Sequence, residues 1–124
     1  MENFFAAKAG FFDEQIASLV KPGGIIAVSV PGLKQEFADG VPEALCPFWQ
    51  EDMNSVLYSA KWWRELLSAS KKGVVERVWL LACHWEAWEN WLQCDNPYAQ
   101  RDIAMIEAEK GMYFDTIGLI VRAI

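Results

Sequence analysis

The segment from Lys21 to Leu33, which reads KPGGIIAVSVPGL, constrains the fold more than any other stretch of the chain. Its lysine, proline and two glycines are typical of a helix that ends in a tight turn. Residues 24–30 are rich in β-branched side chains, carry no charge and show no polar alternation. This pattern predicts a strand covered on both faces, as in the parallel sheets of α/β proteins. Pro31 and Gly32 are expected to end the strand.

The remaining chain divides into further helices and strands around this one. Apolar residues at helical spacing predict helices over 3–20, 60–70, 85–93 and 97–110, and apolar runs predict strands over 74–83 and 116–124. Residues 33–58 are irregular and predict a loop with one short helical turn near Glu43. A loop of this length is usually functional or forms a cover. The predicted order is α-β-α-β-αα-β within a single domain, 1–124.

Composition narrows the class of protein. Of 124 residues, 53% are apolar and 23% are charged, which is typical of a globular chain. The net charge is −6 and the basic residues are scattered, which disfavours a nucleic acid or an anionic membrane as the main partner. Three cysteines at no framework spacing indicate reduced thiols in the cytoplasm. The sequence shows neither the pattern of a signal peptide nor an apolar run long enough to span a membrane.

Motifs that carry chemistry are scarce. The chain has no phosphate loop, no dinucleotide fingerprint and no zinc-type CxxC pair. Cys83, His84 and Cys94 are residue types that bind metals, but they are too few and at no standard spacing, so packing and loop roles are favoured. A nucleophile pair of Cys83 and His84 is disfavoured as well, because neighbours on a strand point to opposite faces.

His84 is the single histidine and stands where a predicted strand gives way to a helix, a place where site residues are common. A capping or surface role is the favoured interpretation, and a site role is the alternative. Trp85, Trp88 and Trp91 repeat at helical spacing, which is typical of a core. If part of this stripe is open, an aromatic wall would be able to hold a cation or a flat ring.

Tyr98 follows the turn Asp95-Asn96-Pro97. For this segment, a helix start is the favoured interpretation and a binding site is the alternative. The substrate-binding candidates are therefore His84, Trp85, Trp88 and Tyr98. Glu107, Glu109 and Lys110 are expected to form a solvated face, and no catalytic or metal-binding residue is predicted.

Several blocks of the sequence resemble a known family. FFDEQIASLVKPGGIIAVSVPGL is similar to the approach to the fifth strand of class I, Rossmann-like S-adenosylmethionine-dependent methyltransferases. Further blocks match in order: KQEF, VPEALCPFW, SAKWWRELL, VERVWLLACHW, WEAWENWLQCDNPYAQRDIAMIEAEKG and the final strand. The likeness extends over nearly the whole chain, and it is greatest to bacterial enzymes of the small-molecule type with unassigned substrates.

The resemblance implies a partial Rossmann-like α/β fold with about four helices. The last strand of such enzymes is antiparallel and lies between the fifth and the sixth. This implies a three-stranded mixed sheet with 116–124 in the middle, 24–30 on one side and 74–83 on the other. It also implies that 33–58 and 84–98 shape the pocket for the methyl acceptor.

The same resemblance implies that the cofactor-binding half is missing from the chain. In the family, S-adenosylmethionine is held by a glycine-rich loop after the first strand and by residues after the second and fourth strands. Residues 1–124 contain none of these positions and no G-x-G sequence. The chain alone is therefore expected to bind no cofactor.

Three functions follow from this pattern as hypotheses. The first is the C-terminal, substrate-side portion of a methyltransferase, inactive alone, whether a fragment, a truncated product or half of a split enzyme. The alternative is a non-catalytic binding or assembly module derived from that fold, and the third is an unrelated small enzyme that uses His84. Whether the chain itself is an enzyme stays open.

A strand at 24–30 without its neighbour would have a free edge, which is a pairing hazard. We therefore expect a homodimer or a complementary chain at this edge, with Ile25, Ile26, Val28 and Val30 at the interface.

Overall fold

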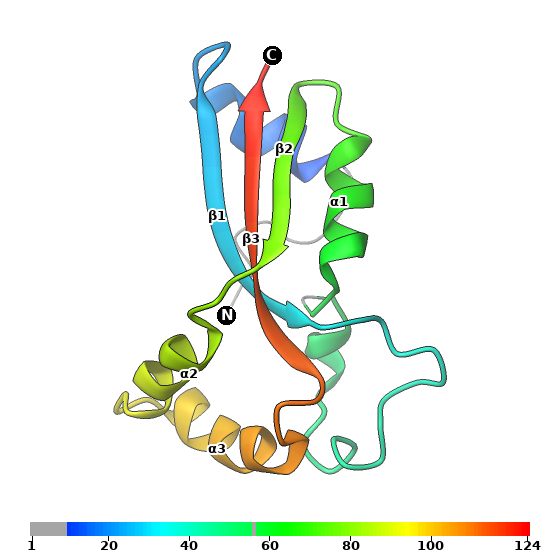
Figure 1. The fold of residues 1–124 in the computed structure, drawn as a ribbon, viewed down its shortest axis with the longest axis vertical. Coiled ribbons are helices and arrows are strands. Elements are labelled where there is room, and N and C mark those ends of the chain that lie inside the picture. The colour runs from blue at the N-terminus through cyan, green and yellow to red at the C-terminus, as the bar shows by residue number, and fades with distance from the viewer. Residues whose placement is uncertain (1–9, 56) are drawn as a thin grey trace.

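A three-stranded sheet forms the centre of the protein in the computed structural model, which describes residues 10–55 and 57–124 (Figure 1). Its strands are β1 (Ile25–Leu33), β2 (Gly73–Leu80) and β3 (Phe114–Ala123). The strand order is β1-β3-β2, and both outer strands pair antiparallel with β3. The expected α/β class and the central, antiparallel last strand are confirmed. The expectation of a mixed sheet is wrong, because both pairings are antiparallel.

Three α-helices are present in the described part of the chain: α1 (Ala60–Ser68), α2 (His84–Leu92) and α3 (Pro97–Glu109). All three were predicted from the sequence. Ser59 caps α1 by accepting a hydrogen bond from the backbone N–H of Trp62 at 3.2 Å. Short helical turns also occur at Phe12–Ile16, Ala17–Leu19 and Glu51–Ser55.

The helix expected over 3–20 differs from the prediction. Residues 3–9 lie outside the described residues. Gly10 has a φ of +86°, and the chain after it forms one π-helical turn and one 3-10 turn rather than a regular α-helix. Glycine adopts a positive φ without steric cost, so Gly10 permits this irregular start.

One face of the sheet carries the main core. The helical turns near the N-terminus and α1 pack against it, and Trp63 and Leu67 are almost fully buried there. β3 contributes Ile117, Leu119 and Val121 to this face, each 1% exposed or less. Alternate residues of a strand point to one face, so these three side chains lie together in the main core.

The opposite face of β1 is not covered as the sequence predicted. Along β1, exposed residues alternate with more buried ones, and Ile25 is 47% exposed. The prediction of a strand covered on both faces is therefore wrong for the described residues. Ala27 and Ser29 belong to the exposed set, and their small side chains expose little apolar surface.

The strand also continues through Pro31 and Gly32, where it was expected to stop. Proline lacks an N–H group, but at this register its nitrogen faces the outer edge, where no ladder hydrogen bond is lost. At Gly32, an added Cβ would lie 2.4 Å from Cδ1 of Ile117 and 2.5 Å from the carbonyl oxygen of Tyr58. Glycine is used here for a close approach, not for a turn.

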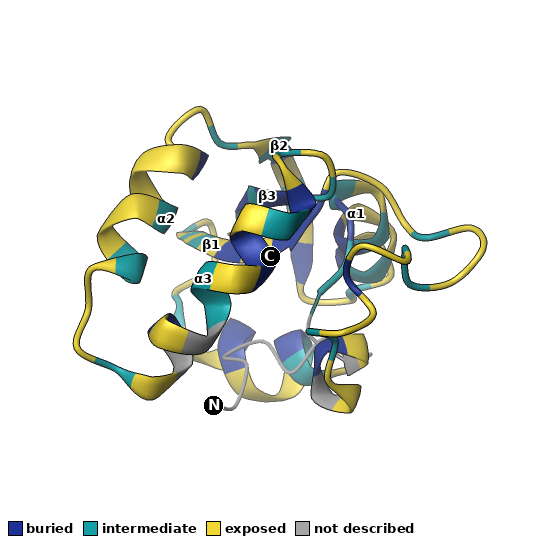
Figure 2. Cartoon of the chain, turned by 90° about the horizontal axis from the view of Figure 1, so that it is seen from below, coloured by how far each residue is buried: buried dark blue, intermediate teal, exposed yellow. Residues whose placement is uncertain are grey.

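Residues 33–58 fold against α2, α3 and the start of β3 as a second apolar cluster, at the end of the molecule away from the C-terminus (Figure 1). Leu45 is completely buried in it, and hydrogen bonds from its N–H and that of Cys46 to Pro42 form the expected turn near Glu43. Figure 2 shows buried residues along β3 and exposed residues on much of α2. The segment 33–58 is thus a core-forming cover for this end of the sheet.

Candidate functional site

A pocket of about 300 Å³ lies where α2 and α3 approach the sheet. Its lining is largely apolar, and the indoles of Trp88 and Trp91 form part of its wall opposite Val30 and Pro31 of β1. A cavity of this size is at the lower end of those that hold small organic ligands. The pocket therefore suits one small ring or a short apolar chain.

Three polar groups line this pocket, which we call the tryptophan pocket. The carboxylate of Asp102 in α3 accepts a hydrogen bond from Nε1 of Trp91 at 2.9 Å, and this contact links α2 to α3. The other two groups are Thr116 of β3 and Ser29 of β1. Few, well-placed polar groups in an apolar wall are typical of sites that orient a ligand.

The end of β2 places α2 over this site. The N–H of Leu81 donates to the carbonyl oxygen of Thr116 at 2.8 Å, and the N–H of His84 donates to that of Leu81 at 3.3 Å. The chain turns here and starts α2 at His84. The first residue of α2 is thereby held beside β3.

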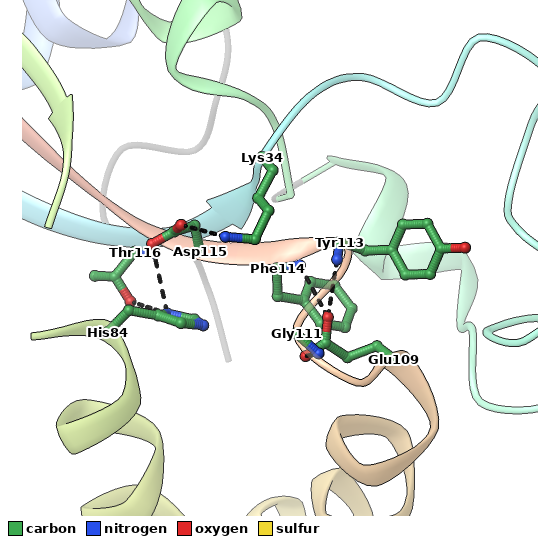
Figure 3. Close-up of polar contacts among 8 residues, drawn as sticks. All are labelled: Lys34, His84, Glu109, Gly111, Tyr113, Phe114, Asp115 and Thr116. Atoms are coloured by element: carbon green, nitrogen blue, oxygen red, sulfur yellow. Dashed lines mark hydrogen bonds and ion pairs between the residues drawn. The ribbon is translucent and has the colours of Figure 1, made fainter. Parts of the chain in front are cut away.

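His84 is 5% exposed, so the surface interpretation of this residue is wrong. Its Nδ1 lies 2.9 Å from Oγ1 of Thr116 (Figure 3). Its Nε2 is buried without a hydrogen-bond partner among the described residues. The imidazole also packs against Trp88, with ring centroids 6.2 Å apart.

Asp115 is the charged group nearest to this histidine. It is 7% exposed, and its Oδ2 accepts from Nζ of Lys34 at 2.9 Å. Its Oδ1 accepts from the N–H of Thr116 at 2.8 Å and lies 3.9 Å from Nδ1 of His84. Figure 3 shows Lys34, Asp115, Thr116 and His84 side by side. Lys34 and a backbone N–H thus supply the hydrogen-bond donors that a buried carboxylate needs.

Burial lowers the pKa of His84 below 6.5, and the nearby Asp115 carboxylate raises it only in part. The imidazole is therefore neutral at pH 7. We assign its proton to Nδ1, because the carboxylate is on that side and a buried acceptor without a partner is better tolerated than a buried donor. Nδ1–H then donates to Thr116, whose own hydroxyl proton is left to donate into the tryptophan pocket.

Glu109 is the second buried carboxylate of this region and was expected to be solvated. It is 1% exposed. Its Oε1 accepts from the N–H of Gly111 at 2.8 Å, and its Oε2 accepts from those of Tyr113 and Phe114 at 2.9 and 3.2 Å. The expectation that Glu109 is solvated is therefore wrong. Its carboxylate is buried because it accepts hydrogen bonds from three backbone N–H groups in the turn that leads into β3 (Figure 3).

The candidates from the sequence are only partly brought together. His84 and Trp88 lie side by side at the tryptophan pocket. Trp85 lies away from it, 52% exposed, and an added Cβ on Gly111 would be 3.0 Å from Cζ2 of this indole. Tyr98 is in the first turn of α3, and its side chain lies outside the described residues.

The sequence reasoning missed Lys34, Asp102, Asp115 and Thr116 as parts of the site. The local signal for Asp115 and Thr116 is a polar pair at the start of a strand whose next five residues are apolar. Lys34 and Asp115 are 81 residues apart in the sequence, so their contact exists only through the β1–β3 register.

The described residues contain no group of three or more histidine, cysteine, aspartate or glutamate side chains that could hold a metal ion. Among the same residues, no helix has the length and apolarity needed to cross a membrane. Comparison with protein-family models, curated proteins and solved structures finds no significant match, so the geometry of this site is the basis for any functional assignment.

Proposed function

We propose that the chain is the substrate-side portion of a Rossmann-like S-adenosylmethionine-dependent methyltransferase, and that its tryptophan pocket binds the methyl acceptor. The proposal of a Rossmann-like fold is supported by the strand order β1-β3-β2, with an antiparallel last strand in the middle. This is the arrangement that the sequence resemblance implies. The exposed, free cysteines are compatible with a reducing compartment, and we place the protein in the cytoplasm.

The residues described here do not fit S-adenosylmethionine itself. The single glycine pair is a tight turn: a Cβ on Gly24 would lie 2.4 Å from Cγ1 of Val20, and the N–H of Gly24 is used by the carbonyl oxygen of Lys21. No backbone cradle for a nucleoside is left there. In our proposal, another chain or segment supplies the cofactor, and this chain contributes acceptor binding alone.

The acceptor that fits the tryptophan pocket is a small aromatic ring with a hydroxyl or amine group. The faces of Trp88 and Trp91 favour stacking on a flat ring. The Thr116 hydroxyl, which accepts from Nδ1–H of His84, is free to donate a hydrogen bond to the hydroxyl or amine of the ligand. Positioning of the acceptor is the contribution to catalysis that these residues make in this proposal.

Phenol tests acceptor binding, with intrinsic tryptophan fluorescence as the readout. We expect saturable quenching that weakens about tenfold in Trp88→Ala, because the stacking partner is lost. Trp62→Phe is the matched control, because Trp62 stacks on Tyr58 in the other apolar cluster, with centroids 3.6 Å apart. Equal quenching of the native protein and Trp88→Ala would contradict the site.

Calorimetric titration with S-adenosylmethionine tests the proposal that another chain or segment supplies the cofactor site. We expect no heat of binding for the chain alone, and binding restored on mixing with a glycine-rich α/β half that complements it. Tight binding of S-adenosylmethionine by the isolated chain would contradict the proposal that the chain is only the substrate-side portion of a methyltransferase.

A non-catalytic binding or assembly module is the second candidate, and the unpaired edge of β1 favours it. Phenol binding without methyl transfer, in the presence of a complementing half and cofactor, would favour this candidate over the first.

A further inference from the structure

β1 is an edge strand, and no strand of the described chain pairs with its outer side. Its hydrogen-bonding pattern follows from two contacts: the N–H of Lys34 donates to Tyr113, and the N–H of Ala123 donates to Gly24. Because hydrogen-bonded pairs alternate in an antiparallel ladder, the even-numbered residues of β1 direct their backbone groups to β3. The odd-numbered residues direct theirs outward.

The outward-facing groups form a short, bounded template. Ile25, Ala27 and Ser29 each present an N–H and a carbonyl to the outside. Pro31 has no N–H to offer, and the N–H of Leu33 already donates to the carbonyl oxygen of Tyr58 at 3.0 Å. The pairing-competent part of the edge therefore extends from Ile25 to Ser29.

Among the described residues, nothing gives this part of the edge the usual protection against pairing. Natural edges are blunted by charges, prolines, bulges or a covering element. No charged residue occurs between Gly24 and Leu33, and Pro31 protects one end alone. The nearest cation on the exposed face is Arg122 of β3, and it is neutralised by Glu76 at 2.5 Å. Two copies would meet here without a pair of like charges, although the net charge of the chain is −6.

We propose that a second copy of this chain pairs antiparallel with Ile25–Ser29, so that Ala27 stands opposite Ala27 of the other copy. A twofold axis perpendicular to the sheet then passes between the two alanines. Ile25 of each copy stands opposite Ser29 of the other. The outward N–H and carbonyl groups of Ile25, Ala27 and Ser29 in one copy then form about six hydrogen bonds with the same groups in the other copy. The result is a continuous sheet of the order β2-β3-β1-β1-β3-β2.

The pairing rests on the backbone more than on the side chains expected at this interface. Ile26, Val28 and Val30 lie on the covered face within or against the core of their own chain. Ile25 is the large apolar side chain that the edge exposes. The small side chain of Ala27 leaves room for its counterpart across the axis.

Ala27→Pro tests the proposal by sedimentation equilibrium. The substitution removes the N–H that both copies use at the axis, so we expect the dissociation constant of the dimer to rise about thirtyfold. The fold should survive, because Pro31 already occupies the same kind of outward position in this strand. Ala27→Ser keeps both the N–H and a small side chain and is the matched control, and circular dichroism checks that each variant is folded.

Ala27→Glu and Ala27→Lys test whether this residue faces itself. Each variant alone places two like charges opposite each other and should be mainly monomeric, whereas an equimolar mixture should dimerise. Ala27 does not line the tryptophan pocket, so phenol binding by the monomeric variants reports separately on the proposed function. A native protein that stays monomeric at micromolar concentration would overturn the proposal. Dimers that Ala27→Pro leaves unchanged would overturn it as well.

Discussion

Nδ1 of His84 and Oγ1 of Thr116 lie 2.9 Å apart, although the two residues begin α2 and line β3, respectively. This contact connects a buried, neutral imidazole to a hydroxyl at the tryptophan pocket. Together with the backbone hydrogen bond from Leu81 to Thr116, it holds the start of α2 beside the sheet.

Thr116→Val should destabilise the protein by about 1–2 kcal/mol, because it leaves Nδ1 of His84 buried without a partner while it preserves the shape of the side chain. The free energy of unfolding in urea measures the effect. Thr116→Ser keeps the hydroxyl and should recover most of the loss. If the valine variant is as stable as the serine variant, the contact does not contribute to folding.

His84 should also make stability depend on pH near neutrality. Burial lowers its pKa in the folded protein below the unfolded value of 6.5, so the unfolded chain binds more protons as the pH falls. The free energy of unfolding should therefore be constant at pH values well above 6.5 and decrease as the pH falls through 6.5, as measured between about 7.5 and about 5.5.

The control for the pH dependence is His84→Gln. His84 is the only histidine of the chain, so this variant should lose most of the slope between the two pH values. An unchanged slope in the glutamine variant would assign the dependence to other groups. Urea midpoints at both pH values, with one buffer ionic strength, measure it.

Glu109→Ala should destabilise the protein by about 3 kcal/mol. It removes the carboxylate that accepts from three backbone N–H groups in the turn between α3 and β3. Glu107→Ala is the matched control on the same helix, because Glu107 is exposed and its loss should change stability by less than about 0.5 kcal/mol. Similar unfolding free energies for the two variants would contradict the buried role.

Gly32→Ala should cost about 2 kcal/mol. The new methyl would lie 2.5 Å from the carbonyl oxygen of Tyr58, so β1 must move away from the segment that leads into α1. Ser29→Ala, at an exposed position of the same strand, should be close to neutral. Thermal unfolding of both variants is the measurement, and a neutral Gly32→Ala would show that the strand tolerates a wider separation.

Local patterns of the sequence determined most elements. The apolar runs predicted all three strands, and Ser59 and Gly111 marked where one helix begins and another is followed by a turn. These predictions succeed because propensity, spacing and capping act over a few neighbouring residues. The same local reasoning failed at Pro31 and Gly32. Pro31 is tolerated in the strand because its nitrogen faces the outer edge, and Gly32 is needed because the backbone of Tyr58 approaches closely. Neither feature can be seen from neighbouring residues in the sequence.

The tertiary structure alone decided the site and the exposure of charged and apolar groups. Glu109 reads as a solvated residue, yet it is buried because three N–H groups converge on it after the chain turns. Lys34 meets Asp115, and His84 meets Thr116, only through the pairing of β1 and the end of β2 with β3. Contacts between residues this far apart depend on strand register, which the side-chain pattern of a single strand does not specify.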